Sequence, residues 1–245
     1  MSIYKALPLC CSVPGPEDVD GIGNFYLHIL APAPSQFPVA TLYFFDTHGE
    51  VHGKWFRGKE YERITAEQTE WFRKSARANQ ATREQHNDGT YCHHSLAFVH
   101  IPLPVFADDS KLQKISGRRR EPTEGSDEDS GLYHALAEAG IGALACGHDH
   151  VNDFVARPRQ ASSARHGPPP YLLYPGTPGY GGYCSYNGTR YPRRVRVYRC
   201  TKRRLATWLH VEYEEAPVDE IVLVDEGKSV HLPDQQADRG ICVMS

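Results

Sequence analysis

The sequence feature that most constrains this chain is Gly-His-Asp-His at 147–150, which directly follows a short apolar run at 141–146. An apolar run that ends at glycine is typical of a buried strand that runs into a loop. In an extended loop, residues i and i+2 point the same way, so His148 and His150 can face one metal ion or two adjacent ions. The alternative is a pair of surface histidines in a turn, because a short His-x-His pattern is not specific by itself.

A third histidine occupies the same kind of position in another predicted strand. The segment 95–101 (SLAFVHI) is rich in strand-forming residues and is stopped by prolines at 102 and 104. His100 therefore falls at the end of that strand, as His148 and His150 follow theirs. Functional groups of open α/β sheets gather at the carboxyl ends of the strands, which favours a metal site that these three histidines share.

Strands and helices alternate in the first two thirds of the chain, and strands alone follow. Two segments are predicted to be helices: 66–78, which begins with the capping-box pair Thr65 and Gln68, and 131–140, which ends at glycine. The predicted strands are 24–30, 41–46, 95–101, 141–146, 171–174, 193–200, 205–213 and 220–224. This order predicts an α/β fold, either a mixed sheet with flanking helices or two packed sheets covered by helices.

Three stretches between these elements are predicted to be loops. Residues 79–93 are polar, and 107–130 joins a basic run to an acidic one, which is typical of a solvated insertion. Residues 156–170 (ARPRQASSARHGPPP) are predicted to be a second flexible insertion. We expect one domain over 1–228 and a polar tail over 229–245.

Composition excludes several classes of protein. The formal net charge of -3 provides no global basic field to attract nucleic acid or anionic lipid, so no nucleic-acid partner is expected. The sequence contains no apolar run near the roughly 20 residues of a membrane span, and its first residues form a poor signal peptide. The 7 cysteines include no Cys-x-x-Cys pair, which favours a reducing, cytoplasmic location.

Two short modification signals point in different directions. Asn187-Gly188-Thr189 is a glycosylation sequon, which counts only in a secreted protein. The last four residues begin with Cys242 and match a prenylation signal, so membrane contact is expected only if Cys242 is lipidated. The sequence indicates no oligomeric state.

Several motifs in order resemble one known family. They are GPEDVDGIGNFY, TLYFFDTHG, ITAEQTEWFRKSA, LAFVHIPLPVF, GHDHVNDF and the Gly/Tyr-rich loop that leads into RRVRVYR, and they lie within 14–228. The chain resembles the purple-acid-phosphatase-like branch of the calcineurin-like metallophosphoesterases. The resemblance implies a four-layer αββα fold and a two-metal centre of Fe, Zn, Mn or Mg ions that hydrolyses phosphate esters. It also implies that His100 and His148 bind one metal ion and that His150 binds the other.

The chain departs from this family where carboxylate ligands are expected. The family's centre also requires a Gly-Asp motif, a bridging Asp and an Asn-His motif, yet this sequence contains neither a Gly-Asp nor an Asn-His dipeptide. The resemblance is therefore to the second half of the domain, with a half-built site and an exposed sheet edge. Two readings stay open: a phosphate-ester hydrolase by descent, or an inactive truncated half-domain or interaction module. A partner that supplies the missing half is a third.

Other polar residues near these motifs have less specific readings. Asp149 and Asp153 flank the histidines and are predicted to support the ligands or form turns rather than to bind metal. Asp46 and His48 are predicted to order their loop, and His93 and His94 are expected at the surface. Arg193 and Arg194 follow the Gly/Tyr-rich loop and could either serve a phosphate site or lie on an exposed strand face.

Overall fold

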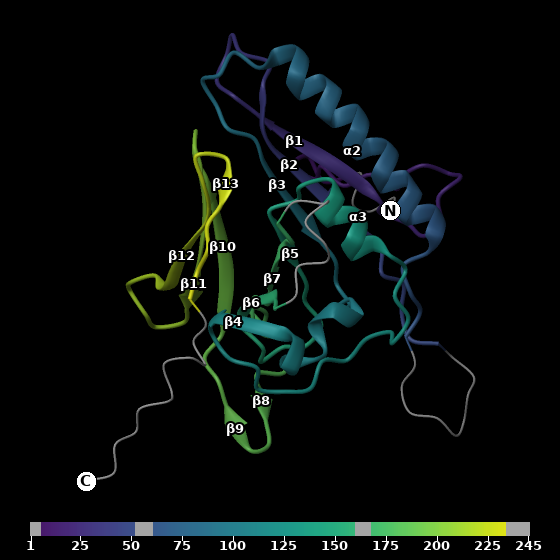
Figure 1. The fold of residues 1–245 in the computed structure, drawn as a ribbon. Helices are drawn as coiled ribbons and strands as arrows, with labels where there is room; N and C mark the ends of the chain where they lie inside the picture. Colours follow the sequence, from purple (N-terminus) through teal and green to yellow (C-terminus); the bar gives the residue numbers. More distant parts are fainter. Residues whose placement is uncertain (1–5, 52–60, 160–167, 234–245) are drawn as a thin grey trace.

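The computed structural model describes residues 6–51, 61–159 and 168–233, and its centre is a seven-stranded sheet in the order β1-β2-β3-β5-β7-β6-β4 (Figure 1). The strands are β1 Phe25–Leu30, β2 Pro38–Phe44, β3 His94–Phe98, β4 Leu112–Ser116, β5 Ala143–Ala145, β6 Val155–Pro158 and β7 Tyr171–Leu173. Neighbouring strands from β2 through β3 and β5 to β7 pair in parallel, while β1, β6 and β4 pair antiparallel. The carboxyl ends of the four parallel strands consequently meet at one edge.

A second, four-stranded antiparallel sheet packs beside the first. It contains β10 Arg194–Cys200, β11 Arg204–Val211, β12 Val218–Asp225 and β13 Lys228–Ser229. A short hairpin of β8 Ser185–Tyr186 and β9 Thr189–Arg190 precedes it. Asn187 and Gly188 form the hairpin turn with φ of 48° and 77°, a conformation that favours Asn-Gly. The Asn-Gly dipeptide of the sequon is therefore explained by the turn that it forms.

Both α-helices of the described residues, α2 Ala66–His86 and α3 Leu132–Glu138, share one apolar core with the large sheet (Figure 1). The other face of that sheet forms a second core with the four-stranded sheet. Leu96 belongs to the second core and Ala97 to the first, because successive side chains of a strand point to opposite faces. The described elements thus form three layers, helix on sheet on sheet. The predicted α/β class is confirmed, and the outer helical layer of an αββα sandwich is not among these elements.

The longest helix continues beyond its predicted end. The capping box is as expected, since Thr65 Oγ1 accepts from Gln68 N at 3.3 Å and Gln68 Oε1 accepts from Thr65 N at 2.8 Å. The prediction that 79–93 is a loop was wrong for its first half, because α2 extends to His86. Asn79 is buried and donates to Tyr43 Oη at 3.0 Å, so a polar residue faces the core there. The last two turns of α2 therefore have a polar sequence, and this is why they were not predicted to be helical.

His94 was expected at the surface, and that expectation was wrong. Strand β3 begins at His94, and only 2% of the residue is exposed. Its Nε2 bonds the carbonyl oxygen of Thr201 at 3.0 Å, in the turn between β10 and β11. Sequence spacing alone did not predict this contact, because the partner lies more than 100 residues away.

The two predicted insertions also contain regular structure. The segment 107–130 includes β4 and the 3₁₀ turn η2 Asp109–Lys111, and a further turn, η1 Pro104–Phe106, precedes it. The segment 156–170 begins within β6, and its residues 160–167 lie outside the described part of the chain. Both strands pair at one edge of the large sheet, so these segments are partly framework rather than wholly solvated loops.

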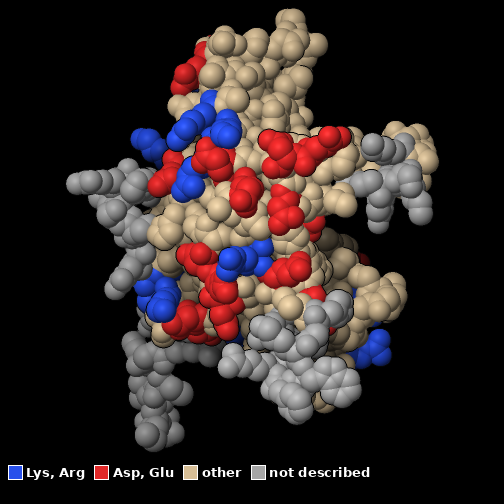
Figure 2. Space-filling view, turned by 90° about the vertical axis from the view of Figure 1, so that its right-hand side faces the viewer, with Lys and Arg blue, Asp and Glu red and all other residues tan. Residues whose placement is uncertain are grey.

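The surface of the described residues is charged and of mixed sign. Figure 2 shows acidic side chains interspersed with basic ones over one face of the molecule. At the edge of the large sheet, β1 exposes apolar side chains, including Ile29 and Leu30. In the part of the chain that the structure describes, neither α-helix combines the length and apolarity needed to cross a bilayer.

We expect Thr65→Ala to lower the free energy of unfolding by about 1 kcal/mol, because it removes the side-chain acceptor at the start of α2. Thr82→Ala, within the same helix, is the matched control and should be neutral or slightly stabilising through higher helix propensity. Urea denaturation of both variants measures the difference. Equal effects at the two positions would contradict a capping role for Thr65.

His93 predicts an acid-sensitive contribution to stability. Burial, together with the nearby Arg83 charge, lowers the pKa of His93 to about 3 from an ordinary value of 6.5. Between these values the unfolded chain binds a proton that the folded chain does not, so this contribution to stability is lost as pH falls from 6.5 towards 3. His93→Gln should flatten the pH profile of the unfolding free energy. A pH profile that is the same in His93→Gln as in the wild type would contradict this contribution.

Candidate metal site

Two neighbouring parallel strands bring the predicted histidines together. β3 ends just before His100, and β5 ends just before the 147–150 loop. The backbone N–H of Gly147 donates to the carbonyl oxygen of His100 at 2.9 Å and ties the two loops to each other. The rings of His100 and His148 consequently lie with their centroids 5.4 Å apart, edge to face.

Glycine at 147 leaves room for the His100 ring. A Cβ atom added at this position would lie 3.2 Å from His100 Nδ1 and 3.7 Å from its Cε1. Such a contact is tighter than ordinary van der Waals packing, so a larger residue would press on the imidazole. The glycine of the Gly-His-Asp-His motif is therefore explained by the neighbouring strand's histidine.

The 147–150 loop is a turn rather than the extended segment expected from its sequence. His148 has a φ of 68°, and Asp149 N donates to Gly147 O at 2.8 Å. A non-glycine residue in this left-handed region is uncommon and is often found at functional sites. Burial lowers the pKa of His100, and the charge of His150 lowers it further. The lowered pKa favours the neutral imidazole, which is the form that binds metal ions.

His148 contacts a tyrosine that the sequence did not single out. Tyr61 lies just before α2, is 8% exposed, and places its hydroxyl 3.0 Å from His148 Nε2. The same hydroxyl donates to Glu124 Oε2 at 3.1 Å. Burial, followed by the bond to Glu124, raises the pKa of Tyr61, so the hydroxyl keeps its hydrogen.

His150 is held by the Gly/Tyr-rich loop. Its ring stacks on Tyr183 with the centroids 4.1 Å apart, and its Nδ1 bonds the carbonyl oxygen of Tyr183 at 3.1 Å. The Tyr183 hydroxyl donates to Glu121 Oε2 at 2.9 Å, although 49% of the residue is exposed. Gly182 allows this approach, since a Cβ there would lie 2.7 Å from His150 Cε1.

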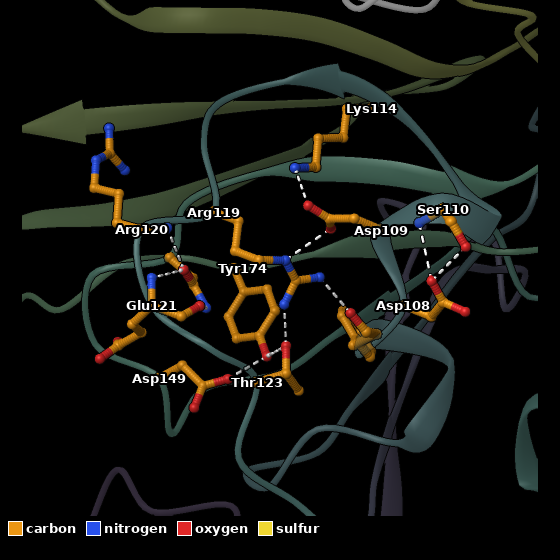
Figure 3. A network of polar contacts seen from close by, with 12 residues as sticks. Asp108, Asp109, Ser110, Lys114, Arg119, Arg120, Glu121, Thr123, Asp149 and Tyr174 are labelled. Atoms are coloured by element: carbon orange, nitrogen blue, oxygen red, sulfur yellow. Dashed lines mark hydrogen bonds and ion pairs between the residues drawn. The ribbon is translucent and has the colours of Figure 1, made fainter.

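Asp149 and Asp153 were predicted to support the histidines or to form turns, and the structure gives both carboxylates partners other than the histidines. Asp149 accepts from Tyr174 Oη and, at 3.1 Å, from Glu124 N (Figure 3). Burial raises the pKa of Asp149 to about 6. The Tyr174 hydroxyl also bonds Thr123 Oγ1. Arg119 donates to the same Thr123 oxygen and, at 2.7 Å, to Asp109 (Figure 3).

Asp153 lies within a cluster of arginines. Its carboxylate pairs with Arg120 at 2.6 Å and with Arg194, and it accepts from Arg118 N at 2.8 Å. Burying a carboxylate is costly unless charge and hydrogen bonds compensate, and here three groups do so. The alternative that Arg194 lies on an exposed strand face was wrong, because Arg193 and Arg194 are both buried.

The charged segment 118–124, which was predicted to be solvated, forms hydrogen bonds with residues 149–153 in and after the histidine loop. Asn152 Oδ1 accepts from Arg120 N at 2.7 Å, and Glu121 Oε1 accepts from Val151 N at 2.8 Å. Glu121 is buried, so part of the apparent charge run is internal. Neither periodicity nor spacing signalled these roles, because they depend on contacts about 30 residues apart.

Asp46 orders its loop, in keeping with the expected structural role. Its carboxylate accepts from Ile22 N at 2.7 Å and from His48 N at 2.9 Å. Cys242 lies outside the described residues.

The donor set fits part of a metal centre. The three imidazoles suit Zn, Fe or Mn, and those of His100 and His148 are close enough to share one ion. Yet residues 6–51, 61–159 and 168–233 contain no group of three or more His, Cys, Asp or Glu side chains placed to hold a metal ion. Two carboxylates of the described residues around this loop, those of Asp149 and Glu124, bond to tyrosines. The described residues therefore do not fit a complete binuclear site.

Gly182→Ala is expected to separate Tyr183 from His150 and to cost about 1–3 kcal/mol in unfolding free energy, as overpacked positions do. Gly181→Ala is the matched control, because a Cβ there meets no atom within 4 Å. Urea denaturation measures the stability, and the His150 ring resonances in NMR spectra report the local contact. An equal response to the two substitutions would refute the steric explanation.

Comparison with known proteins supplies the family. The chain is 31% identical over 197 residues to probable inactive purple acid phosphatase 29 of Arabidopsis thaliana, which covers 78% of this chain and 47% of that protein. It is 30% identical over 210 residues to probable inactive purple acid phosphatase 14 of the same plant, covering 80% and 48%. Phosphatase DCR2 of Saccharomyces cerevisiae is 29% identical over 201 residues, covering 78% and 32%.

No protein-family model matches the chain, and no solved structure matches it significantly. The chain spans about half the length of the plant relatives and about a third of the yeast one. The matched region includes most of this sequence, and the resemblance of the motifs around His100 and 147–150 agrees with the relatives' names. The chain belongs to the purple-acid-phosphatase-like branch of the calcineurin-like metallophosphoesterases.

Proposed function

We propose that this chain carries the histidine half of a metallophosphoesterase-type phosphatase centre, and that by itself it binds a metal ion without hydrolysing phosphate esters. The observation that carries the proposal is the pairing of His100 with His148 at the ends of two parallel strands, where the described residues group no three His, Cys, Asp or Glu side chains to hold a metal ion. His150 adjoins this pair from the same loop. The names of the two plant relatives, each a probable inactive phosphatase, are consistent with it.

Metal binding is supported by the chemistry of the three imidazoles. Burial lowers the pKa of His100 and favours its neutral form. A bound ion would supply a Lewis acid for a phosphoryl group. Two neutral imidazoles leave most coordination positions of that ion to water, so we expect weak binding of one ion rather than a stable pair of ions.

We expect no hydrolysis because the carboxylates near the histidines are bonded to other groups. Two cations close together repel each other, and a bridging carboxylate normally offsets that repulsion. Asp149 is committed to Tyr174 and Asp153 to arginines, so neither is available to bridge. Phosphate esters remain the substrate class that the family implies, and the cytoplasmic location inferred from the cysteines stays a prediction.

We expect isothermal titration to detect weak binding of about one Zn²⁺ per chain. His100→Ala and His148→Ala should each lower the affinity by roughly 100-fold, since loss of a supporting group alone can cost that much. His134→Ala, on the exposed side of α3, should bind like the wild type. Unchanged affinity after replacing both His100 and His148 would refute the site.

A chromogenic phosphomonoester, assayed with added Zn²⁺, Mn²⁺ or Fe²⁺, should show no turnover above the metal-containing buffer. The name of the yeast relative keeps the alternative of an active phosphatase open. Turnover that is lost with a chelator and in His148→Ala would favour that alternative and contradict the proposed inactivity.

A further inference from the structure

We propose that Arg193 is a positioning residue that clamps the loop 179–183 and thereby holds Tyr183 against His150. The inference rests on the proposed function for its purpose, because His150 lies in the same loop as His148, to which metal binding is assigned. The clamp itself is a property of the metal-free chain. It gives a role to one of the two arginines that follow the Gly/Tyr-rich loop.

The guanidinium group of Arg193 spans two carbonyl groups of one loop. Its Nη1 donates to the carbonyl oxygen of Gly179, and its Nη2 donates to that of Gly182 at 3.2 Å. Only 9% of Arg193 is exposed, so these bonds lie largely away from water. A planar guanidinium presents its N–H groups in a rigid fork, which fixes the separation of the two acceptors that it bonds.

The clamped part of the backbone is the part that contacts His150. A Cβ atom at Gly182 would lie 2.7 Å from His150 Cε1, and the carbonyl oxygen of Tyr183 lies 3.1 Å from His150 Nδ1. The rings of Tyr183 and His150 stack with their centroids 4.1 Å apart. The carbonyl oxygen of Gly182 belongs to the peptide group that joins Gly182 to Tyr183, so a bond to this oxygen fixes the peptide next to both contacts.

The four-stranded sheet in turn holds Arg193 in place. Arg193 immediately precedes β10, its backbone N–H donates to Glu212 Oε2 at 3.3 Å, and its carbonyl oxygen accepts from Glu212 N at 2.7 Å. Glu212 immediately follows β11 and also accepts from Tyr180 Oη at 2.9 Å. The centroid of the Tyr180 ring lies 4.7 Å from Arg193 Cζ, a cation–π contact. The sheet thereby sets where the loop lies.

The neighbouring arginine has different partners. Arg194 is also buried, and its guanidinium pairs with the carboxylate of Asp153. Arg193 directs both of its terminal nitrogens to carbonyl oxygens of the 179–183 loop. Two consecutive arginines thus hold different segments. Arg194 binds a residue that follows the histidine motif, and Arg193 binds the loop that contacts His150.

Arg193→Lys tests the fork of donors apart from the positive charge. Lysine keeps the charge and most of the aliphatic stem, but its ammonium group is a point charge and lacks the planar fork that bonds two carbonyl groups at once. Arg199→Lys is the matched control, because Arg199 belongs to the same strand, β10, but is exposed and pairs with Glu220.

The experiment is NMR on the full metal-free chain at one fixed pH. In the wild type and in Arg199→Lys, the rings of His150 and Tyr183 should show nuclear Overhauser contacts, and the Tyr183 ring should shift the His150 ring protons upfield. In Arg193→Lys these contacts should be lost and the His150 resonances should move downfield. Unchanged contacts in Arg193→Lys, together with a lower unfolding free energy in urea, would show a purely structural role and overturn the proposal.

Arg193→Ala with added guanidinium chloride provides a second route. The truncation removes both donors and leaves room for a small planar cation, so the contacts between His150 and Tyr183 should be lost. Guanidinium, at a concentration far below that of unfolding, should restore them, and sodium chloride at equal ionic strength should not. Contacts that persist in Arg193→Ala, or a loss that guanidinium does not reverse, would also overturn the positioning role.

Zinc titration of the same variants separates this inference from the proposed function. A wild type that binds no Zn²⁺, but whose stacked rings separate in Arg193→Lys, would refute the metal site and leave the clamp intact. A wild type that binds Zn²⁺, with a contact between His150 and Tyr183 that is unchanged in Arg193→Lys, would do the reverse.

Discussion

One backbone hydrogen bond joins the two loops on which the candidate site depends. Gly147 N donates to His100 O at 2.9 Å, and together with Val99 N, which donates to Ala145 O, it continues the parallel pairing of β3 with β5 beyond the strands. Because the pairing is parallel, both strands end at the same edge and their loops leave side by side. A glycine is needed where the His100 ring approaches the backbone. The distance between His100 and His148 follows from these two conditions.

Buried polar groups, and not apolar packing alone, hold the loop that carries His148 and His150. Asp149, Asn152 and Asp153 are each buried and bonded to the segment 118–124 or to its neighbours. Removing one partner from such a buried network typically costs about 3–5 kcal/mol, because the other charge is left without compensation. A loop fixed in this way holds its histidines in one orientation, which a weak, partly formed metal site would need.

The carboxylates around the histidines are the basis of the proposal that this chain binds a metal ion without hydrolysing phosphate esters. A metallophosphoesterase centre needs carboxylate oxygens that converge on the metal ions. Here the nearby acidic groups bond to tyrosines, arginines and backbone N–H groups, and so stabilise the loop. Within the described residues, these carboxylates thus belong to the structure that supports the histidine loop.

The sequence alone determined the class of fold, the main strands, the capping of α2 by Thr65 and Gln68, and the meeting of His100 with the 147–150 loop. These features depend on local periodicity, on capping chemistry and on the rule that parallel strands end together. Only the tertiary structure decided that α2 continues through Asn79, that His94 is buried, and that Tyr61 and Tyr183 contact the site histidines. Those contacts join residues tens of positions apart, and no local pattern in the sequence records which distant partner satisfies a buried polar group.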